Sequence, residues 1–435
     1  MQFNRRQFLK GASALVAGTH VLFLGSRAAR AAGPSDPILV LVNLRGGNDA
    51  LNTVIPLNNV GAPQRSLYDS LRPNLAIRTS LLGGMEIGAD PQLGTALALH
   101  PALADLKTLY DEGKLAIVNG VGIANSSLSH FEAEDVWYSA NPSGLQDTGW
   151  MGRHLDASFN DEETRAISFG STVNSTLASL WNDALGVNAV DRFDLPDDSY
   201  SEFRDLASRL PSWTSIYADD RGGASLAARI GRSGTRVVET SQLFDQIETR
   251  GWGSLNEGAG NGLSDDLRDV ASILRHDQLN PGAATGLCFF HCQTGGFDTH
   301  SRQGTTDIEA GHPRLMDRLS RGLYGFQRDL EALGLAHRVV TVVYTEFGRR
   351  AHQNDSGGNA GTDHGRAGSL FALGQPVIGG LYGRVPELDA LDAGGNLVVN
   401  TDFRRVYAAL VDDWLGGNHT AVLPGGPFVP LPFIA

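Results

Sequence analysis

The chain has 435 residues, and its hydrophobic content of 41% is typical of a globular protein. Its 53 glycines follow no period and its two cysteines cannot form a disulfide framework, so collagen-like and disulfide-held folds are excluded. The 35 basic and 48 acidic side chains give a net charge of −13, which argues against nucleic acid or an anionic membrane as a general partner.

The N-terminal segment has the pattern of an export signal. Residues 4–10, Asn-Arg-Arg-Gln-Phe-Leu-Lys, contain the paired arginines of a twin-arginine signal, and residues 11–25 are a modestly apolar stretch too short for a stable membrane span. Ala29-Arg30-Ala31 then offers a cleavage site. We predict a twin-arginine signal peptide over residues 1–31, the twin-arginine translocation machinery as partner, a periplasmic or secreted location, and no membrane span after processing.

Cleavage after residue 31 would make the chain more acidic. The signal carries five basic and no acidic side chains, so residues 32–435 keep 30 basic and 48 acidic ones, a net charge of −18. A bound divalent cation can reverse the local potential of such a surface. A small-molecule or glycan ester that carries negative charge is therefore not excluded as a substrate.

Four apolar runs indicate strands that lead into glycine-rich loops: residues 37–44, 115–122, 286–291 and 339–344. Continuous aliphatic and β-branched runs are typical of parallel strands covered on both faces. Helical patterns cover residues 101–112, 312–333 and 403–415. The alternation predicts an α/β fold, a doubly wound and mostly parallel sheet flanked by helices, whose ligand site lies beyond the carboxyl ends of the strands.

The segment from about 150 to 270 differs from the rest of residues 32–435. Its strand signals are weaker, it is rich in Asp, Ser and Gly, and its patterns are more helical. We interpret it as a cap or insertion of helices and loops within one large domain.

Carboxylates and imidazoles follow the predicted strands: Asp49, Asp298, His300, Glu346 and His364. Ser129 and His130 follow the second apolar run. Because the carboxyl ends of parallel strands meet at one edge of a sheet, we expect these side chains to converge there. Such ligands suit Zn²⁺ or Mn²⁺, or harder ions such as Mg²⁺ and Ca²⁺. The sequence therefore predicts a site for one or more divalent metal ions.

Five short motifs carry a resemblance to a known family: residues 44–49 (Leu-Arg-Gly-Gly-Asn-Asp), 129–137 (Ser-His-Phe-Glu-Ala-Glu-Asp-Val-Trp), 295–300 (Gly-Gly-Phe-Asp-Thr-His), 345–349 (Thr-Glu-Phe-Gly-Arg) and 361–365 (Gly-Thr-Asp-His-Gly). In kind and order they resemble an uncharacterised bacterial family exported by the twin-arginine route, domain of unknown function 1501. That family is placed in the alkaline-phosphatase/sulfatase-like superfamily. The resemblance implies an alkaline-phosphatase-like fold and a metal site, but no substrate.

The resemblance also implies roles for single residues. Asp49 matches a metal ligand at the end of the first strand, and Ser129 matches the nucleophile at a helix N-terminus, where the helix dipole favours an alkoxide. Asp298 and His300 match a metal-binding pair, although their spacing is shorter than in the superfamily. No Cys/Ser-x-Pro-x-Arg motif surrounds Ser129, so formylglycine is not expected.

Two alignments are open for the last strand of the superfamily. Residues 361–365 could supply its Asp-His pair, which leaves only His419 as a later ligand. We prefer the alignment in which Thr345-Glu346-Phe347-Gly348 ends the strand and His364 is the later ligand. One metal would then contact Asp298, His300 and His364. The other would contact Asp49, Glu346 and the Ser129 oxygen, with Phe347 where a ligand His is expected.

The remaining polar residues each have a functional and a structural interpretation. His130 is either an acid of the site or a brace of its loop, and Asp363 either binds metal or orients His364 from behind. Arg45 and Arg349 either bind the outer oxygens of a phosphate or sulfate ester or bridge loops. His312 either joins the metal ligands or starts the helix that Pro313 opens, and we favour the second; we expect His291 and His100 to be structural.

Two hypotheses follow for the whole chain. The first is a periplasmic metal-dependent hydrolase of phosphate, sulfate or related esters, with Ser129 as nucleophile. The second is an exported, non-catalytic binding or assembly protein that keeps the fold and one structural metal. Asp49, Ser129, Asp298 and His364 favour the first, whereas Phe347 and the short Asp-x-His spacing favour the second.

Overall fold

The computed structural model describes residues 36–144, 146–159, 164–193, 226–249 and 262–435, together with positions 211, 212, 215 and 217. The predicted signal peptide lies outside the described residues, as do parts of the 150–270 segment. No helix among the described residues has both the length and the apolar character needed to cross a bilayer.

The centre of the molecule is a mostly parallel sheet of nine strands, which confirms the predicted fold class. Its order is β13-β5-β12-β9-β1-β8-β6-β7, and β14 pairs with β5 beyond this path. The only antiparallel strand in it is β12, between β5 and β9. The strands are β1 (Ile38–Leu44), β5 (Leu115–Gly122), β6 (Ala166–Phe169), β7 (Ala184–Val187), β8 (Phe289–Thr294), β9 (Val339–Tyr344), β12 (Gly368–Leu373), β13 (Gly380–Gly383) and β14 (Thr401–Asp402).

The predicted apolar runs occupy the middle of this sheet. β1 pairs in parallel with β8 on one side and β9 on the other, and every residue of β1, β5 and β9 is buried. β8 begins at Phe289, three residues later than predicted. The cause is a turn before it, in which the Thr285 hydroxyl donates to Asp277 and accepts from the Leu287 N–H.

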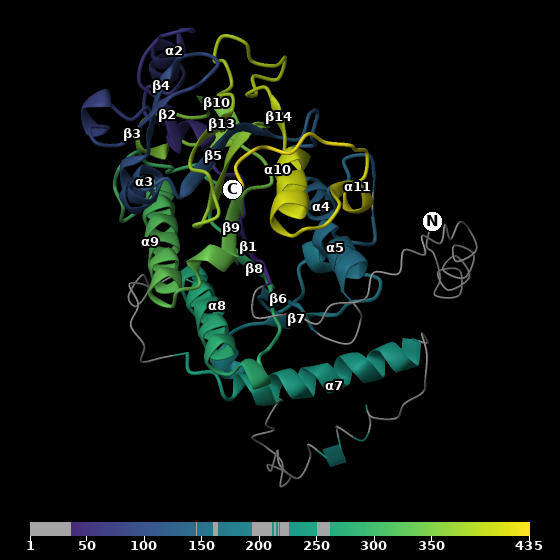
Figure 1. The fold of residues 1–435 in the computed structure, drawn as a ribbon. Helices are drawn as coiled ribbons and strands as arrows, with labels where there is room; N and C mark the ends of the chain where they lie inside the picture. Colours follow the sequence, from purple (N-terminus) through teal and green to yellow (C-terminus); the bar gives the residue numbers. More distant parts are fainter. Residues whose placement is uncertain are drawn as a thin grey trace.

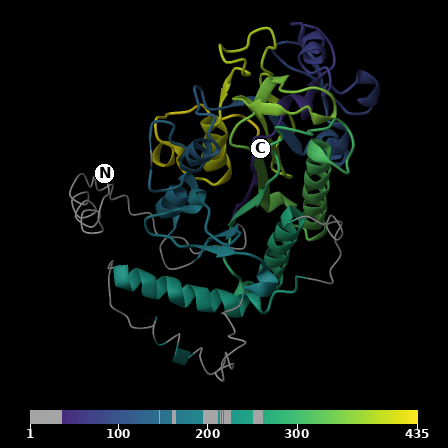
Figure 2. The ribbon, with the colours of Figure 1, turned by 180° about the vertical axis from the view of Figure 1, so that it is seen from behind.

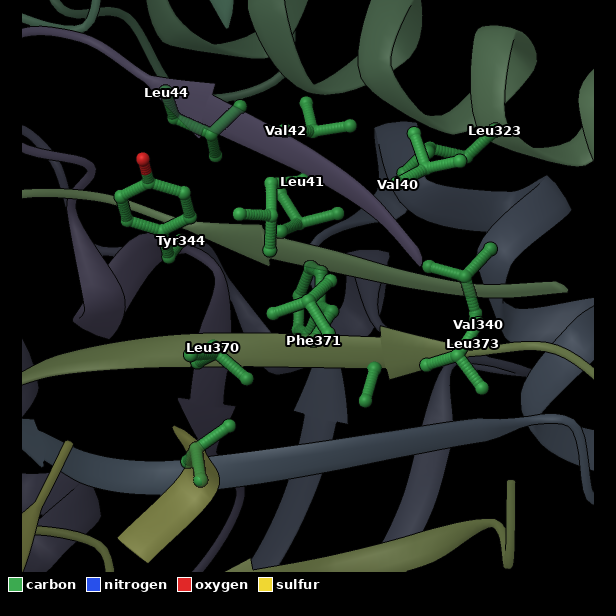
Figure 3. Packing of buried hydrophobic residues seen from close by; sticks show 14 of the residues in the cluster. Val40, Leu41, Val42, Leu44, Leu323, Val340, Tyr344, Leu370, Phe371 and Leu373 are labelled. Atoms are coloured by element: carbon green, nitrogen blue, oxygen red, sulfur yellow. The ribbon is translucent and has the colours of Figure 1, made fainter. Parts of the chain in front are cut away.

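Helices cover both faces of the sheet (Figure 1). α3 (Ala104–Asp111), α8 (Gly262–Leu279) and α9 (Gly311–Ala332) lie on one side, and α4 (His130–Ser139), α5 (Trp150–Ser158) and α10 (Arg404–Ala409) on the other; Figure 2 shows the same layers from behind. Leu319, Leu323, Phe326 and Leu330 of α9 are buried at helical spacing. In Figure 3, Leu323 packs beside Val40 of β1, where helix and sheet form the core.

The other elements surround this core. Two small sheets contain β2 (Val54–Pro56), β3 (Glu86–Ala89) and β4 (Ala96–Leu99), and β10 (Arg349–Gln353) with β11 (Thr362–His364). Further helices are α2 (Gln64–Leu71), α7 (Leu226–Phe244) and α11 (His419–Val422), with a π-helical turn, Leu410–Trp414, after α10. Short 3-10 turns are Ala50–Asn52, Thr79–Leu81, Pro101–Leu103, Ser175–Leu177, Val190–Arg192, Pro281–Ala283, Ala336–Arg338 and Gly357–Asn359.

The 150–270 segment is not entirely separate from the central layers. β6 and β7 from this segment are strands of the central sheet, where β6 pairs with β8. α8 packs against β8 and α9. These parts of the segment therefore extend the core, and the domain limits stay a prediction.

Candidate metal centre

Three imidazole rings surround one carboxylate at the carboxyl edge of the sheet. The Oδ1 atom of Asp298 lies 3.1 Å from Nε2 of His300, 3.1 Å from Nε2 of His364 and 3.7 Å from Nε2 of His130. Ligand atoms of His130, Asp298 and His364 all lie within 4.8 Å of one another. We call these four residues the metal cluster.

Three different parts of the fold supply the metal cluster. Asp298 and His300 lie in the loop after β8, His364 ends β11, and His130 is the first residue of α4, which follows β5. The loop after β1 passes directly behind Asp298. The approach is so close that a Cβ at Gly46 would collide with the Asp298 main-chain nitrogen. The convergence expected at this edge therefore occurs, although not with the full set of predicted residues.

Each imidazole is oriented by an acceptor at its other nitrogen. Nδ1 of His364 donates to the Leu128 carbonyl at 2.8 Å, Nδ1 of His300 to Asp363 at 3.0 Å, and Nδ1 of His130 to Glu346 at 2.7 Å. A carbonyl or carboxylate can only accept, so these partners assign the proton of each neutral ring to Nδ1. All three Nε2 lone pairs are then left to face Asp298.

This arrangement fits a cation. Nε2 of His300 and Nε2 of His364 lie 2.9 Å apart, and neither has a proton to share when Nδ1 is protonated. Two lone pairs and a carboxylate oxygen at this distance repel one another unless a positive charge lies between them. Tetrahedral zinc, with bonds of about 2.0–2.2 Å, separates its ligand atoms by about 3.3–3.5 Å, close to the observed spacing. A set rich in imidazole suits Zn²⁺ or Mn²⁺ better than Ca²⁺.

Arg349 holds the Asp298 carboxylate from the interior of the protein. Its guanidinium is fully buried and donates to Oδ1 of Asp298 at 2.5 Å. Partial burial acts to raise the pKa of Asp298, but the hydrogen bond and charge of Arg349 outweigh it, so the pKa lies below its ordinary value. The remaining Arg349 donors bind main-chain carbonyls of Gly46, Gly47, Phe297 and Thr362. Arg349 therefore bridges loops and is not exposed to a substrate.

Asp49 is not part of the metal cluster, which corrects the role expected for it. Its carboxylate is fully buried, forms an ion pair with the equally buried Arg72 at 2.5 Å, and accepts from Gln303. Burial acts to raise the pKa of Asp49, but Arg72 outweighs it and holds the carboxylate ionised. The guanidinium of Arg72 takes the place of a cation here, so these residues do not fit a second metal ion.

Glu346 and Phe347 also have supporting positions. Oε1 of Glu346 accepts from His130 Nδ1 and, at 2.8 Å, from the Gly46 N–H, so Glu346 orients a ligand instead of binding the ion. The buried Phe347 ring lies 4.8 Å, between centroids, from the rings of both His130 and His364. Phe347 therefore fills the expected ligand position with an apolar wall that limits the movement of two imidazoles.

Asp363 orients an imidazole from behind, but its partner is His300 instead of His364. Its Oδ1 accepts from His300 at 3.0 Å and from the Asn354 side-chain amide. His364, which Asp363 was expected to orient, is instead held by the Leu128 carbonyl. The exchange arises because Asp363 and His364 are neighbours on β11, where successive side chains point to opposite faces.

Ser129 and Arg45 lie beside the metal cluster. Ser129 is the N-cap residue of α4, is partly exposed, and forms no side-chain capping bond. It lies in the chain between Leu128, which holds His364, and His130. The Arg45 side chain is 47% exposed and is oriented by Glu134, with Nε 2.7 Å from Oε1. Both residues are accessible from the surface, and their roles as nucleophile and ester-binding group stay predictions.

The other buried histidines lie outside the metal cluster. Burial lowers the pKa of His100 to about 4 and those of His291 and His312 to about 3, so all three are neutral interior groups. Pro313 follows His312 in the first turn of α9, as predicted. His419, in α11, lies outside the metal cluster as well: its Nδ1 atom is 2.5 Å from Oδ2 of Asp412 in the π-helical turn Leu410–Trp414.

Comparison with known proteins confirms the family resemblance. The family model described as Protein of unknown function (DUF1501) matches residues 282–408, which include Asp298, His300 and His364. No curated protein matches the chain.

Three solved structures illustrate the kind of protein that aligns with this fold. The lipoteichoic acid synthase LtaP from Listeria monocytogenes aligns at 12% identity and a TM-score of 0.33, over 81% of this chain and 67% of that chain. The periplasmic domain of EcEptC from Escherichia coli, in complex with Zn, aligns at 13% identity and 0.32, over 79% and 74%. The alkaline phosphatase from the Antarctic bacterium TAB5 aligns at 12% identity and 0.26, over 80% and 94%.

Proposed function

We propose that this DUF1501 chain is an exported, metal-dependent hydrolase of phosphate, sulfate or related esters, with a single divalent ion held by the metal cluster. One observation carries the proposal: the Nε2 atoms of three histidines lie within 3.7 Å of the Asp298 Oδ1 atom at a rim where Asp298 and His300 are 46% and 43% exposed. An ion bound there is accessible to water and to a substrate. The buried Asp49–Arg72 pair supports one ion and not two.

The residues around the ion have separate roles in this proposal. When bound, the metal polarises the ester and lowers the pKa of a hydroxyl or water that it contacts. Arg45 binds the outer ester oxygens, since Glu134 fixes its guanidinium while leaving it exposed. Glu346, Asp363 and the Leu128 carbonyl hold the three imidazoles in the tautomer that binds an ion.

Ser129 is the proposed nucleophile. The Ser129 oxygen forms a bond to phosphorus or sulfur while the bond from that atom to the ester oxygen breaks. The hydroxyl proton of Ser129 passes to solvent, and the departing alcohol takes a proton from solvent. The oxygen of a water molecule then bonds to the same phosphorus or sulfur, the bond to the Ser129 oxygen breaks, phosphate or sulfate leaves, and the serine oxygen regains a proton from solvent. The position at the start of the ten-residue helix α4 lowers the energy of the alkoxide form.

Metal analysis and a substrate panel test this proposal. We expect one equivalent of metal in protein purified from periplasm, and turnover of chromogenic phosphate monoesters, phosphate diesters or sulfate esters. Ser129→Ala should abolish turnover and keep the metal, whereas His364→Ala should lose both. His352→Ala, an exposed histidine on β10, serves as the control. Unchanged metal content in both Asp298→Ala and His364→Ala would refute the metal site.

A second function is favoured by the number of ligands. Ligand atoms of His130, Asp298 and His364 lie within 4.8 Å of one another; an ion that also contacts His300 has four protein ligands and a complete tetrahedral shell, as in structural zinc sites, whereas catalytic sites usually keep one position for water. This favours an exported binding or assembly protein with a structural ion. Metal-loaded protein that turns over no ester, with a Ser129→Ala variant identical to the wild type in folding and metal content, would support this alternative.

Export by the twin-arginine route is part of the proposal. The motif at Arg5-Arg6 supports it. Replacing both arginines by lysine should retain the full-length chain in the cytoplasm, measured by fractionation. Continued export of that variant would exclude this route.

A further inference from the structure

Gln303 is a fully buried amide between the metal cluster and the Asp49–Arg72 ion pair. Its side chain is 0% exposed, and its Nε2 donates to Oδ2 of Asp49 at 2.5 Å. Its Oε1 accepts from two hydroxyls, Thr299 at 3.1 Å and Thr362 at 2.7 Å. All hydrogen bonds that the structure gives this side chain lead either to Asp49 or to these threonines.

The two threonines belong to the segments that carry the metal ligands. Thr299 lies between Asp298 and His300, and Thr362 lies two residues before His364. A main-chain bond from the Thr362 N–H to the Thr299 carbonyl, 3.0 Å long, joins the same segments. The Gln303 oxygen therefore clamps together the loop after β8 and strand β11, which supply three of the four ligands.

Asp49 determines which way round the Gln303 amide lies. An ionised carboxylate only accepts hydrogen bonds, so the NH₂ group must face Asp49 and the oxygen must face the threonines. Arg72 keeps Asp49 in that ionised state and is itself fixed by the carbonyls of Ala351, at 2.8 Å, and Arg350, at 2.7 Å. Arg72 therefore determines the donor and the acceptor of each hydrogen bond in the series that runs from Asp49 through Gln303 to the two threonines of the ligand segments.

The backbone before Gln303 shows that its position is imposed by the surroundings. Arg302 has a φ of 50°, in the left-handed region that non-glycine residues rarely adopt. The Gln303 N–H donates to the Ala360 carbonyl at 3.0 Å, and its carbonyl accepts from the His312 N–H at 2.8 Å. A loop that tolerates such a conformation is held by its contacts, which here include the Gln303 side chain.

We propose that Gln303 is the positioning residue of the metal centre: it sets the distance between the ligand segment 298–300 and His364, and Asp49 and Arg72 orient it. This inference rests on the proposed metal site, but not on any catalytic activity. Supporting groups behind metal ligands typically contribute about 10–100-fold to metal affinity. Gln303 lies behind the threonines and does not touch a ligand, but it fixes the distance between the two backbone segments that carry the ligands. We therefore expect it to contribute to metal affinity by the same factor.

A chelator competition titration of the full chain with Zn²⁺ tests the inference. Gln303→Met keeps the size of the side chain and removes its hydrogen bonds, and should weaken Zn²⁺ binding about 10–100-fold. The matched control is Gln64→Met, because Gln64 is another buried amide, bonded to the Pro386 carbonyl and the Leu388 N–H. This control should lose stability but keep the wild-type Zn²⁺ affinity.

A second pair of variants covers the case in which Gln303→Met does not fold. Thr362→Val removes one clamped hydroxyl with little change of shape and should weaken Zn²⁺ binding. Thr362→Ser retains the hydroxyl and should bind almost as the wild type does. Melting of each metal-free variant separates a general loss of stability from a loss of metal affinity.

The outcomes separate this inference from the proposed function. A wild-type chain that binds neither Zn²⁺ nor Mn²⁺ overturns both. If the wild type binds Zn²⁺ and Gln303→Met and Thr362→Val bind it equally well, the clamp is overturned and the metal site stands. Equal losses of affinity in Gln303→Met and Gln64→Met would also overturn the clamp, since the effect would then be general.

Discussion

Gly46 has to approach Asp298 more closely than any residue with a side chain could. Its φ is 119° and a Cβ there would collide with the main chain at Phe297 and Asp298. We predict that Gly46→Ala destabilises the fold by about 1–3 kcal/mol and weakens metal binding, because Asp298 must move. Thermal unfolding and metal titration measure the two effects.

Gly84→Ala is the matched control for this prediction. Gly84 has a φ of 82°, but a Cβ there meets nothing within 4 Å. It therefore carries the backbone strain without the collision, and should lose some stability and no metal affinity. If the two variants bind metal equally well, the packing of Gly46 against Asp298 is irrelevant to the site.

The Asp49–Arg72 pair joins elements that are far apart in the chain. Arg72 follows α2 and donates to the carbonyls of β10, while Asp49 caps the turn after β1. We predict that Arg72→Met destabilises the fold by about 3–5 kcal/mol, since Asp49 would be left as an unpaired buried charge. Chemical denaturation measures this loss. Adding Asp49→Asn to the Arg72→Met variant should recover part of the lost stability, because the unpaired charge is removed. A double variant as unstable as Arg72→Met alone would contradict the explanation.

α8 places a carboxylate against the sheet, which should make stability depend on pH. Burial and the neighbouring Asp269 and Asp265 raise the pKa of Asp266 to about 8. A group whose pKa is higher in the folded than in the unfolded state stabilises fully below the unfolded value, about 4, and this contribution is lost as pH rises towards 8. We predict that Asp266→Asn is more stable than the wild type at pH 8 and that this advantage disappears near pH 4.

Melting temperatures across that range measure the difference. Asp265→Asn is the control, because Asp265 lies next to Asp266 but its side chain is 62% exposed and pairs with Arg268. It should show a smaller dependence on pH than Asp266→Asn, because it removes only the weakest of the three causes that raise the pKa of Asp266. A constant difference between Asp266→Asn and the wild type from pH 4 to 8 would contradict the raised pKa.

The elements that the sequence predicts best are those whose burial is complete. β1, β5 and β9 are continuous apolar runs because helices cover both faces, and α9 shows helical spacing because one stripe faces the sheet. The short strands β6 and β7 have no such signal, since four residues each are too few for a period. β12 runs antiparallel to its neighbours in the sheet. The connections of the chain determine this direction, and the composition of the strand does not.

The site was predictable in its location and only partly in its members. The loop after the parallel strand β8 supplies Asp298 and His300, and the loop after β5 leads to His130, as the strand pattern indicates, whereas His364 ends the antiparallel strand β11. The pairing of Asp49 with Arg72 depends on how the chain after α2 packs against the turn that follows β1. Local spacing in the sequence does not encode this pairing, so tertiary packing determines it.

At the scale of the whole molecule, metal binding and folding should be coupled. The proposed ligands lie at positions 130, 298, 300 and 364, and the unfolded chain cannot hold them together. An ion that binds only the folded state adds about 2.7 kcal/mol of stability when its free concentration is 100 times its Kd. We predict that EDTA lowers the melting temperature of the full chain and that added Zn²⁺ restores it.

Calorimetry with and without EDTA measures this shift. His364→Ala should melt at one temperature in both conditions, because its shell has lost a ligand, whereas Gln64→Met should melt lower but keep the full EDTA shift. The pattern of the two variants distinguishes an ion in the metal cluster from one elsewhere on a surface of net charge −13, where acidic groups bind cations weakly. An EDTA shift that persists in His364→Ala would place the stabilising ion outside the three segments that form the cluster.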